Sequence, residues 1–165
     1  MAGVNHLHVL VADPDAARRG ATADVLREVG WMVEELAGAE EALEACRLDP
    51  PDVVLADESL GLVDAIKSDP DLFGIGVVVR AKRLDVDDAL DGMARGVHVV
   101  LVDPVADAEI VTSVRSAART SVLQQELRSR AAALLSPRAC ACNASTISAS
   151  QRRGSPNASG VALPS

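Results

Sequence analysis

Aromatic side chains are almost absent from this chain of 165 residues, which contains one Trp, one Phe and no Tyr. A core must therefore be built from aliphatic residues, and the hydrophobic types together make up 48% of the sequence. Such a composition is typical of buried parallel sheets that helices cover on both faces. The length suits one domain of ordinary size. Together these features favour an α/β fold.

Basic residues are few, with 16 Lys and Arg against 24 Asp and Glu, which gives a net charge of −8. The acids all lie in residues 1–135, because residues 136–165 contain three arginines and no carboxylate. An acidic surface of this kind repels the phosphate backbone of nucleic acids. We therefore expect no direct contact with nucleic acid.

Long apolar runs are missing as well. No stretch approaches the roughly 20 apolar residues that cross a membrane. The N-terminus, "MAGVNHLHVL", also lacks the positive segment and apolar run of a secretory leader. We therefore expect a soluble, cytoplasmic protein that has no membrane partner.

Cysteine is scarce, and the three that are present form no even disulfide framework. Cys46 lies in a predicted helix, whereas Cys140 and Cys142 lie in the C-terminal stretch. A zinc site at Cys140 and Cys142 would need a partner pair of ligands at the usual spacing, and we find none.

Apolar, β-branched runs alternate with segments of helical spacing along the first 135 residues. The predicted strands are 7–12, 31–36, 52–57, 75–80 and 97–102. Helices are predicted between Asp13 and Gly30, over 39–48, 62–68 and 86–95, and from about Asp107 to about residue 135. This alternation implies a parallel sheet with right-handed crossovers and helices on both of its faces.

Several residues mark where the predicted helices begin and end. Asp13 is placed to cap the first helix, with Pro14 in its first turn and Gly30 as its left-handed end. Asp85 opens the fourth predicted helix and Gly96 closes it.

The last predicted helix is long, since about 29 residues span roughly 43 Å. One interpretation of its C-terminal part is a short dimer seam formed by Leu123, Leu127 and Leu134. The other is a helix exposed to solvent, and two heptads are too few to decide between these two interpretations. From Ser136 the composition shifts to Ser, Ala, Pro, Gly and Arg, which predicts disorder. We therefore divide the chain into a domain over 1–120, a helical extension over 121–135 and a tail over 136–165, and hypothesise that the tail replaces a lost output domain.

Carboxylates follow three of the predicted strands: Asp13, Asp57 and Asp103. In open α/β sheets, function gathers at the carboxyl ends of the strands, near the point where the strand order reverses. Each of these residues has a purely structural alternative. Asp13 suits a helix cap, Asp103, before Pro104, suits a turn, and Asp57 could be only the polar residue that ends a strand.

Residues 6–120 resemble the receiver domain of bacterial two-component response regulators. The resemblance rests on "VLVADPDAARR", "PDVVLAD", "GIGVVVRAK" and "RGVHVVLVDP". It implies a flavodoxin-like (βα)5 fold with strand order 2-1-3-4-5, in which a histidine kinase phosphorylates an aspartate beside a Mg²⁺ ion. By position it makes Asp57 the phosphoacceptor, and Asp13, Asp57 and the Ser59 carbonyl the metal ligands.

The chain departs from the pattern of that family at several pocket positions. Pro14 stands where the second metal-binding acid is expected, with Asp15 one residue further on. Arg80 replaces the hydroxyl residue that contacts the phosphoryl group, and Asp103 replaces the lysine. Val100 stands where an aromatic switch residue is common.

These departures change the electrostatics of the expected pocket. Without the lysine, Asp13, Asp57 and Asp103 would face one another, and like charges at close range resist full ionisation unless a cation intervenes. We expect Arg80 to bind Asp57 or Asp103 as that cation and to lock the domain in one state. The resulting interpretation is a pseudo-receiver with weakened or lost phosphorylation and with weak or absent Mg²⁺ binding.

The predicted function is a signalling module that is not an enzyme. Its partner would be a histidine kinase or another signalling protein, with a homodimer as a further option, bound through the fourth and fifth helices. The alternative is a metal-dependent phosphohydrolase that uses Asp13, Asp57 and Asp103. Against it, the sequence shows no second acid beside Asp13, no general acid and no cap insertion that would exclude water.

Overall fold

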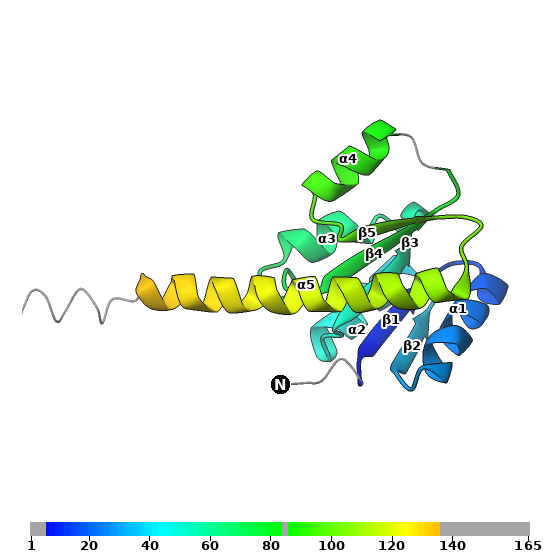
Figure 1. The fold of residues 1–165 in the computed structure, drawn as a ribbon, viewed down its shortest axis with the longest axis horizontal. Helices are drawn as coiled ribbons and strands as arrows, with labels where there is room; N and C mark the ends of the chain where they lie inside the picture. Colours follow the sequence, from blue (N-terminus) through cyan, green and yellow to red (C-terminus); the bar gives the residue numbers. More distant parts are fainter. Residues whose placement is uncertain (1–5, 84–85, 136–165) are drawn as a thin grey trace, which may run out of the picture. The chain divides into compact units, whose positions relative to one another are not determined.

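The computed structural model describes residues 6–83 and 86–135, and within them the chain forms a sheet of five parallel strands (Figure 1). The strand order is β2-β1-β3-β4-β5, as the resemblance implied. The strands are β1 (His8–Ala12), β2 (Met32–Leu36), β3 (Val53–Asp57), β4 (Gly76–Ala81) and β5 (Val99–Val102). Every residue of the central strand β3 is buried, which explains why its sequence is a continuous apolar run.

Helices follow each strand. They are α1 (Ala16–Glu28), α2 (Ala39–Leu48), α3 (Leu62–Ser68), α4 (Val86–Ala94) and α5 (Asp107–Leu134), with one 3₁₀ turn at Glu58–Leu60. All five strands and all five helices lie within two residues of their predicted bounds. None of the described helices combines the length and the apolar character that a membrane span needs.

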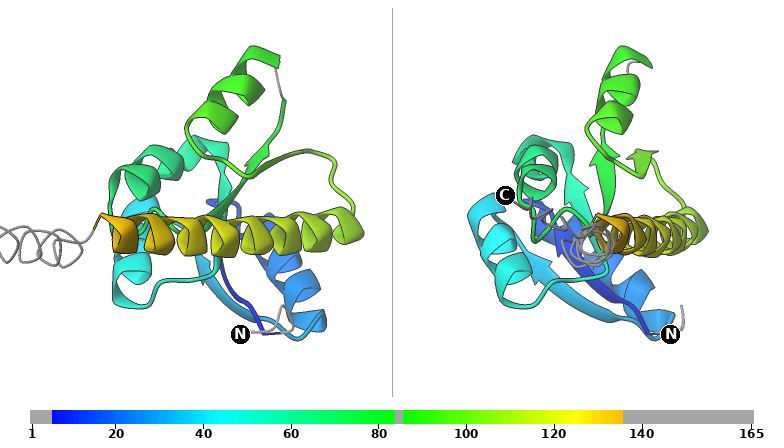
Figure 2. Two further views of the ribbon diagram at one scale, coloured as in Figure 1. Left: turned by 60° about the vertical axis from the view of Figure 1, so that its left-hand side comes forward. Right: turned by 90° about the vertical axis from the view of Figure 1, so that its left-hand side faces the viewer.

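Helices lie on both faces of the sheet (Figure 2), and a hydrophobic core cluster is buried on each face. On one face α1 and α5 pack on the sheet through Leu26, Ile110 and Val114. On the other face α2 and α3 pack through Ala42, Cys46, Leu62 and Ile66. Helix α4 differs from the other helices, because none of its described side chains is fully buried.

The chain divides into two compact units, of which the first ends at Glu126 and the second begins at Leu127. In α5 the buried side chains end with Ser121, and each one from Val122 to Leu135 is exposed. The dimer seam at Leu123, Leu127 and Leu134 stays a prediction. The expected cap at Asp85, the cysteines Cys140 and Cys142, and the tail from Ser136 lie outside the described residues.

The predicted start of the first helix is wrong by two residues. Its cap is Asp15 and not Asp13: the Asp15 carboxylate accepts hydrogen bonds from the N–H groups of Ala17 and Arg18, at 3.0 and 3.2 Å. Asp13 instead accepts the N–H of Asp15 at 2.8 Å, which turns the chain before the helix begins. The helix ends were predicted correctly, since Gly30 and Gly96 both have a positive φ.

Candidate functional site

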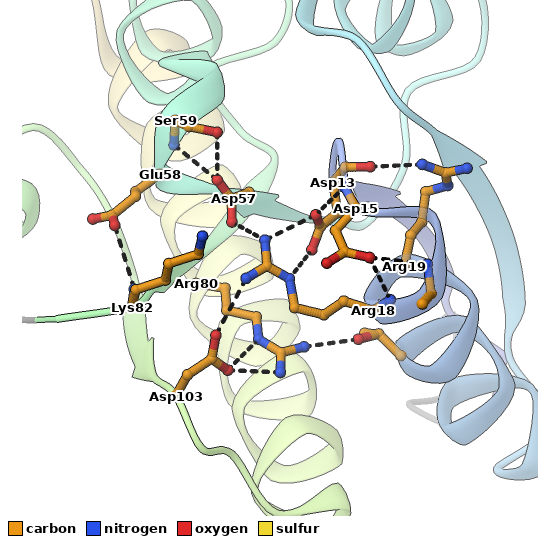
Figure 3. A network of polar contacts seen from close by, with 12 residues as sticks. Asp13, Asp15, Arg18, Arg19, Asp57, Glu58, Ser59, Arg80, Lys82 and Asp103 are labelled. Atoms are coloured by element: carbon orange, nitrogen blue, oxygen red, sulfur yellow. Dashed lines mark hydrogen bonds and ion pairs between the residues drawn. The ribbon is translucent and has the colours of Figure 1, made fainter.

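The carboxylates of Asp13, Asp57 and Asp103 meet at one edge of the sheet (Figure 3). They follow or end strands β1, β3 and β5, and parallel pairing brings these strand ends to the same edge. Asp13 and Asp57 are buried, with 2% and 6% of their surface exposed. The expectation that the three acids face one another is therefore confirmed.

One guanidinium group, that of Arg18, binds all three acids. Its Nε lies 2.5 Å from Oδ2 of Asp13, and its Nη2 lies 2.9 Å from Oδ1 of the same residue. Nη2 also donates to Oδ2 of Asp57, and Nη1 lies 3.3 Å from Oδ2 of Asp103. The hydrogen bond to Asp13, and then the charges of the three acids, raise the pKa of Arg18 above its usual value, although burial opposes this. Arg18 is thus a permanent cation at the centre of the site.

Asp57 uses both of its carboxylate oxygens. Oδ2 accepts from Arg18, and Oδ1 accepts from the N–H of Ser59 at 3.0 Å and from its Oγ at 2.5 Å. Burial acts to raise the pKa of the Asp57 carboxyl, but the hydrogen bonds from Ser59 and the charge of Arg18 outweigh it. The pKa therefore lies below its ordinary value, and Asp57 is ionised at neutral pH.

Arg80 and Asp103 form a second ion pair at the same edge. Nε and Nη2 of Arg80 lie 2.7 and 2.6 Å from Oδ1 of Asp103, and Nη1 donates to Oγ1 of Thr22 at 2.9 Å. The expected bond between Arg80 and Asp103 is present. The side chain of Asp103 therefore forms ion pairs with two arginines, so Asp103 does more than begin a turn.

The sequence analysis missed Arg18, which is the cation bound to Asp57. One signal was available: Arg18 stands five residues after Asp13, in the first turn of the helix that opens at this edge. Helical spacing alone does not separate it from Arg19, which donates to the backbone carbonyl of Asp13 at 2.7 Å. Only the packed structure shows which arginine enters the site.

The remaining predicted positions lie around this cluster. Pro14 is exposed, and the carboxylate of Asp15 is occupied by the helix cap. Val100 is half-buried and lines a cavity of about 210 Å³ beside Asp57, together with Val79 and Val97. An aromatic side chain at position 100 would reach into this space, and valine does not fill it.

The arrangement does not fit a bound Mg²⁺ ion. Mg²⁺ takes six oxygen ligands in near-ideal octahedral geometry, but all four carboxylate oxygens of Asp13 and Asp57 already accept hydrogen bonds from the chain. Among residues 6–83 and 86–135, no three His, Cys, Asp or Glu side chains are arranged to hold a metal ion together. A cation would have to displace Arg18.

The chain is similar in sequence to several transcriptional regulators. No protein-family model matches it. Transcriptional regulatory protein PrrA of Mycobacterium tuberculosis is 29% identical over 121 residues, which cover 71% of this chain and 52% of PrrA. CseB of Streptomyces coelicolor is 28% identical over 115 residues, which cover 68% of this chain and 49% of CseB. The chain thus spans about half the length of these relatives.

Solved structures share the fold. The chemotaxis response regulator CheY4 of Vibrio cholerae matches with a TM-score of 0.63 and 19% identity, over 68% of this chain and 98% of CheY4. A putative response regulator from Chloroflexus aurantiacus matches with a TM-score of 0.64 and 23% identity, with the same coverage of both chains. The compact unit up to Glu126 therefore has the fold of response-regulator receiver domains, and its sequence is similar to the matched parts of these transcriptional regulators.

Proposed function

We propose that this domain is a pseudo-receiver: a cytoplasmic signalling module that acts by contact with another protein and in which phosphorylation of Asp57 is weakened or lost. The observation that supports this most directly is that both oxygens of Asp57 hold hydrogen bonds, from Arg18 and from Ser59. Phosphoryl transfer to a carboxylate requires one oxygen that is free to attack phosphorus in line.

The charges of the site support the same proposal. Proteins promote phosphoryl transfer mainly by positioning the reactants and by supplying cations to the transferred group. Here the guanidinium of Arg80 is bound to Asp103 and Thr22, and that of Arg18 is bound to three acids. Three carboxylates face two guanidinium groups, so the cluster already carries one negative charge in excess before a phosphoryl group arrives.

The same contacts weaken the alternative of a metal-dependent phosphohydrolase. That activity would need Asp13, Asp57 and Asp103 as metal ligands or as a nucleophile, but Arg18 binds all three. No observation favours the hydrolase over the signalling module.

Helix α4 supplies a surface for protein contact. Leu90 and Met93 on this helix are 61% and 58% exposed, and Val102 at the end of β5 is 37% exposed. Leu90 and Met93 are three residues apart and therefore lie on one face of α4, and exposed apolar patches are typical of interaction sites. We propose that a histidine kinase or another signalling protein binds here, with a second copy of the chain as the alternative.

The proposal is tested by intact mass spectrometry after incubation with acetyl phosphate and MgCl₂. We expect no phosphoryl adduct on the wild-type chain, provided that circular dichroism shows the chain to be folded. A mass gain of one phosphoryl group that is absent from Asp57→Asn would contradict the pseudo-receiver and show that Asp57 is active.

Sedimentation over a concentration series tests the partner. A mass that rises with concentration in the wild-type chain, but not in Leu90→Glu/Met93→Glu, identifies the partner as a second copy. A monomer at all concentrations assigns the α4 surface to a different protein.

A further inference from the structure

The guanidinium of Arg18 lies between carboxylates that come from three strands of the sheet. We infer that Arg18 is a built-in counter-ion that stands in place of a divalent cation, so that this domain assembles its acidic site without metal. The inference rests on the proposed function only in treating Asp57 as part of a receiver site. It makes a separate claim about cation binding, which can be measured without any phosphorylation.

The geometry of the contact with Asp13 is that of a strong ion pair. Nε and Nη2 of Arg18 donate to the two different oxygens of Asp13, at 2.5 and 2.9 Å. Such two-point pairing uses the planar shape of guanidinium and is stronger and more directional than a single contact. Nη2 then extends the contact to Asp57, and Nη1 extends it to Asp103. One side chain therefore binds Asp13 and Asp57, the two acids expected to hold a metal, and Asp103 as well.

The position of Arg18 is fixed by the start of α1. Its own N–H donates to the carboxylate of Asp15 at 3.2 Å, which anchors the residue in the first turn of the helix. Its side chain is 15% exposed, and the side chain of Asp13 is 3% exposed. Arg19 holds Asp13 from the other side through its backbone carbonyl, at 2.7 Å. The guanidinium is thus preorganised in the site, and little water competes with it.

The charge balance explains why a metal would not bind beside Arg18. A divalent ion next to the guanidinium would face a positive charge at close range and would find the oxygens of Asp13 and Asp57 already engaged. Without Arg18, the three acids would keep one ion pair among the described residues, that between Asp103 and Arg80, which leaves an excess of two negative charges on Asp13 and Asp57. That excess is what a divalent cation neutralises.

The test is a titration of the full chain with MnCl₂, with free Mn²⁺ followed by electron paramagnetic resonance, and a parallel series with MgCl₂ followed by thermal unfolding. We compare the wild-type chain with Arg18→Ala and with the matched control Arg27→Ala. Arg27 lies on the same helix, is 45% exposed and pairs with Asp24 and Glu35, outside the site.

We expect the wild-type chain and Arg27→Ala to bind Mn²⁺ weakly and to show no Mg²⁺-dependent rise in melting temperature. Arg18→Ala should bind one Mn²⁺ at least about tenfold more tightly, since removal of a close like charge favours the ion. Saturable binding of one Mn²⁺ by the wild-type chain, as tight as in Arg18→Ala, overturns the inference. So does a folded Arg18→Ala that binds no better than the wild-type chain.

If Arg18→Ala does not fold, Arg18→Met keeps the aliphatic stem and answers the same question. If neither variant folds, the wild-type titration decides, because binding of one Mg²⁺ at its acids contradicts a built-in counter-ion and its absence supports one. The two proposals fail separately. A wild-type chain that is phosphorylated but binds no Mn²⁺ refutes only the pseudo-receiver, whereas one that binds Mn²⁺ and is not phosphorylated refutes only the counter-ion.

Discussion

Arg18 and Asp13 form a two-point ion pair in which Nε lies 2.5 Å from Oδ2 and Nη2 lies 2.9 Å from Oδ1. The pair is largely shielded from water, since 15% of the Arg18 side chain and 3% of the Asp13 side chain are exposed. It joins the start of α1 to the end of β1, and through Asp57 it reaches the end of β3. The site and the stability of the fold therefore depend on the same guanidinium.

Replacement of Arg18 by Ala should lower the free energy of unfolding by about 3 to 5 kcal/mol, because it leaves buried carboxylates without their partner. Arg18→Lys should fall between this variant and the wild-type chain, since an ammonium cannot make the two-point contact. Urea unfolding at neutral pH measures both. The more exposed Arg27→Ala should change stability by less than about 1 kcal/mol. An unchanged urea midpoint in Arg18→Ala would mean that the cluster contributes nothing to the fold.

The cavity beside Asp57 should accept a larger side chain at position 100 but not at position 99. Val100 lines that cavity of about 210 Å³, whereas Val99 packs against the core on the other face of the sheet. Val99→Phe should lower the free energy of unfolding by about 1 to 3 kcal/mol, the usual cost of overpacking. Val100→Phe should change it by less than about 1 kcal/mol, because the ring has space to enter. Equal losses in both variants, measured in urea, would contradict this placement of Val100.

Two glycines should respond to alanine in opposite directions. A Cβ at Gly76 would lie 2.9 Å from the carbonyl oxygen of Ala117, a backbone atom that cannot move without shifting α5, so Gly76→Ala should destabilise the domain. A Cβ at Gly20, inside α1, meets no atom within 4 Å. Gly20→Ala should therefore raise the free energy of unfolding by about 0.5 to 1 kcal/mol through its higher helix propensity. Thermal unfolding of the two variants would show whether the melting temperature falls in Gly76→Ala and rises in Gly20→Ala.

His98 should make the stability of the domain depend on pH. Burial, and then the charge of Lys67, lower the pKa of His98, whose Nδ1 accepts a hydrogen bond from the N–H of Val77 at 3.1 Å. Because the folded-state pKa lies below the value of about 6.5 in the unfolded chain, the unfolded state gains its proton first as the pH falls. The free energy of unfolding should therefore decrease as the pH falls below about 6.5 toward the folded-state pKa.

His98→Gln should remove this part of the pH dependence, which urea unfolding at about pH 7.5 and about pH 5.5 measures. His6→Gln, at an exposed position, is the control and should keep the wild-type slope. If His98→Gln and the wild-type chain lose the same stability on acidification, His98 does not contribute to the effect.

The order of strands and helices follows from local patterns in the sequence. Apolar runs such as "VVLA" in β3 specify buried strands, and Gly30 and Gly96 end helices because glycine adopts a positive φ without strain. These signals act over a few residues, so each can be read without knowledge of the fold. The acidic edge was also predictable, since parallel strands bring Asp13, Asp57 and Asp103 to the same end of the sheet.

The partners of those acids were decided by the tertiary structure. Arg18, Arg19 and Arg80 have the same charge and lie close to the same edge, but Arg18 alone binds Asp57, while Arg19 contacts a carbonyl and Arg80 binds Asp103. The start of α1 at Ala16, two residues later than predicted, sets which arginine points inward. A helix turns by 100° per residue, so Arg18 and Arg19 point in different directions. The rotation of α1 about its axis decides which of them is the charge at the centre of the site. That rotation is set only when the helix packs on the sheet.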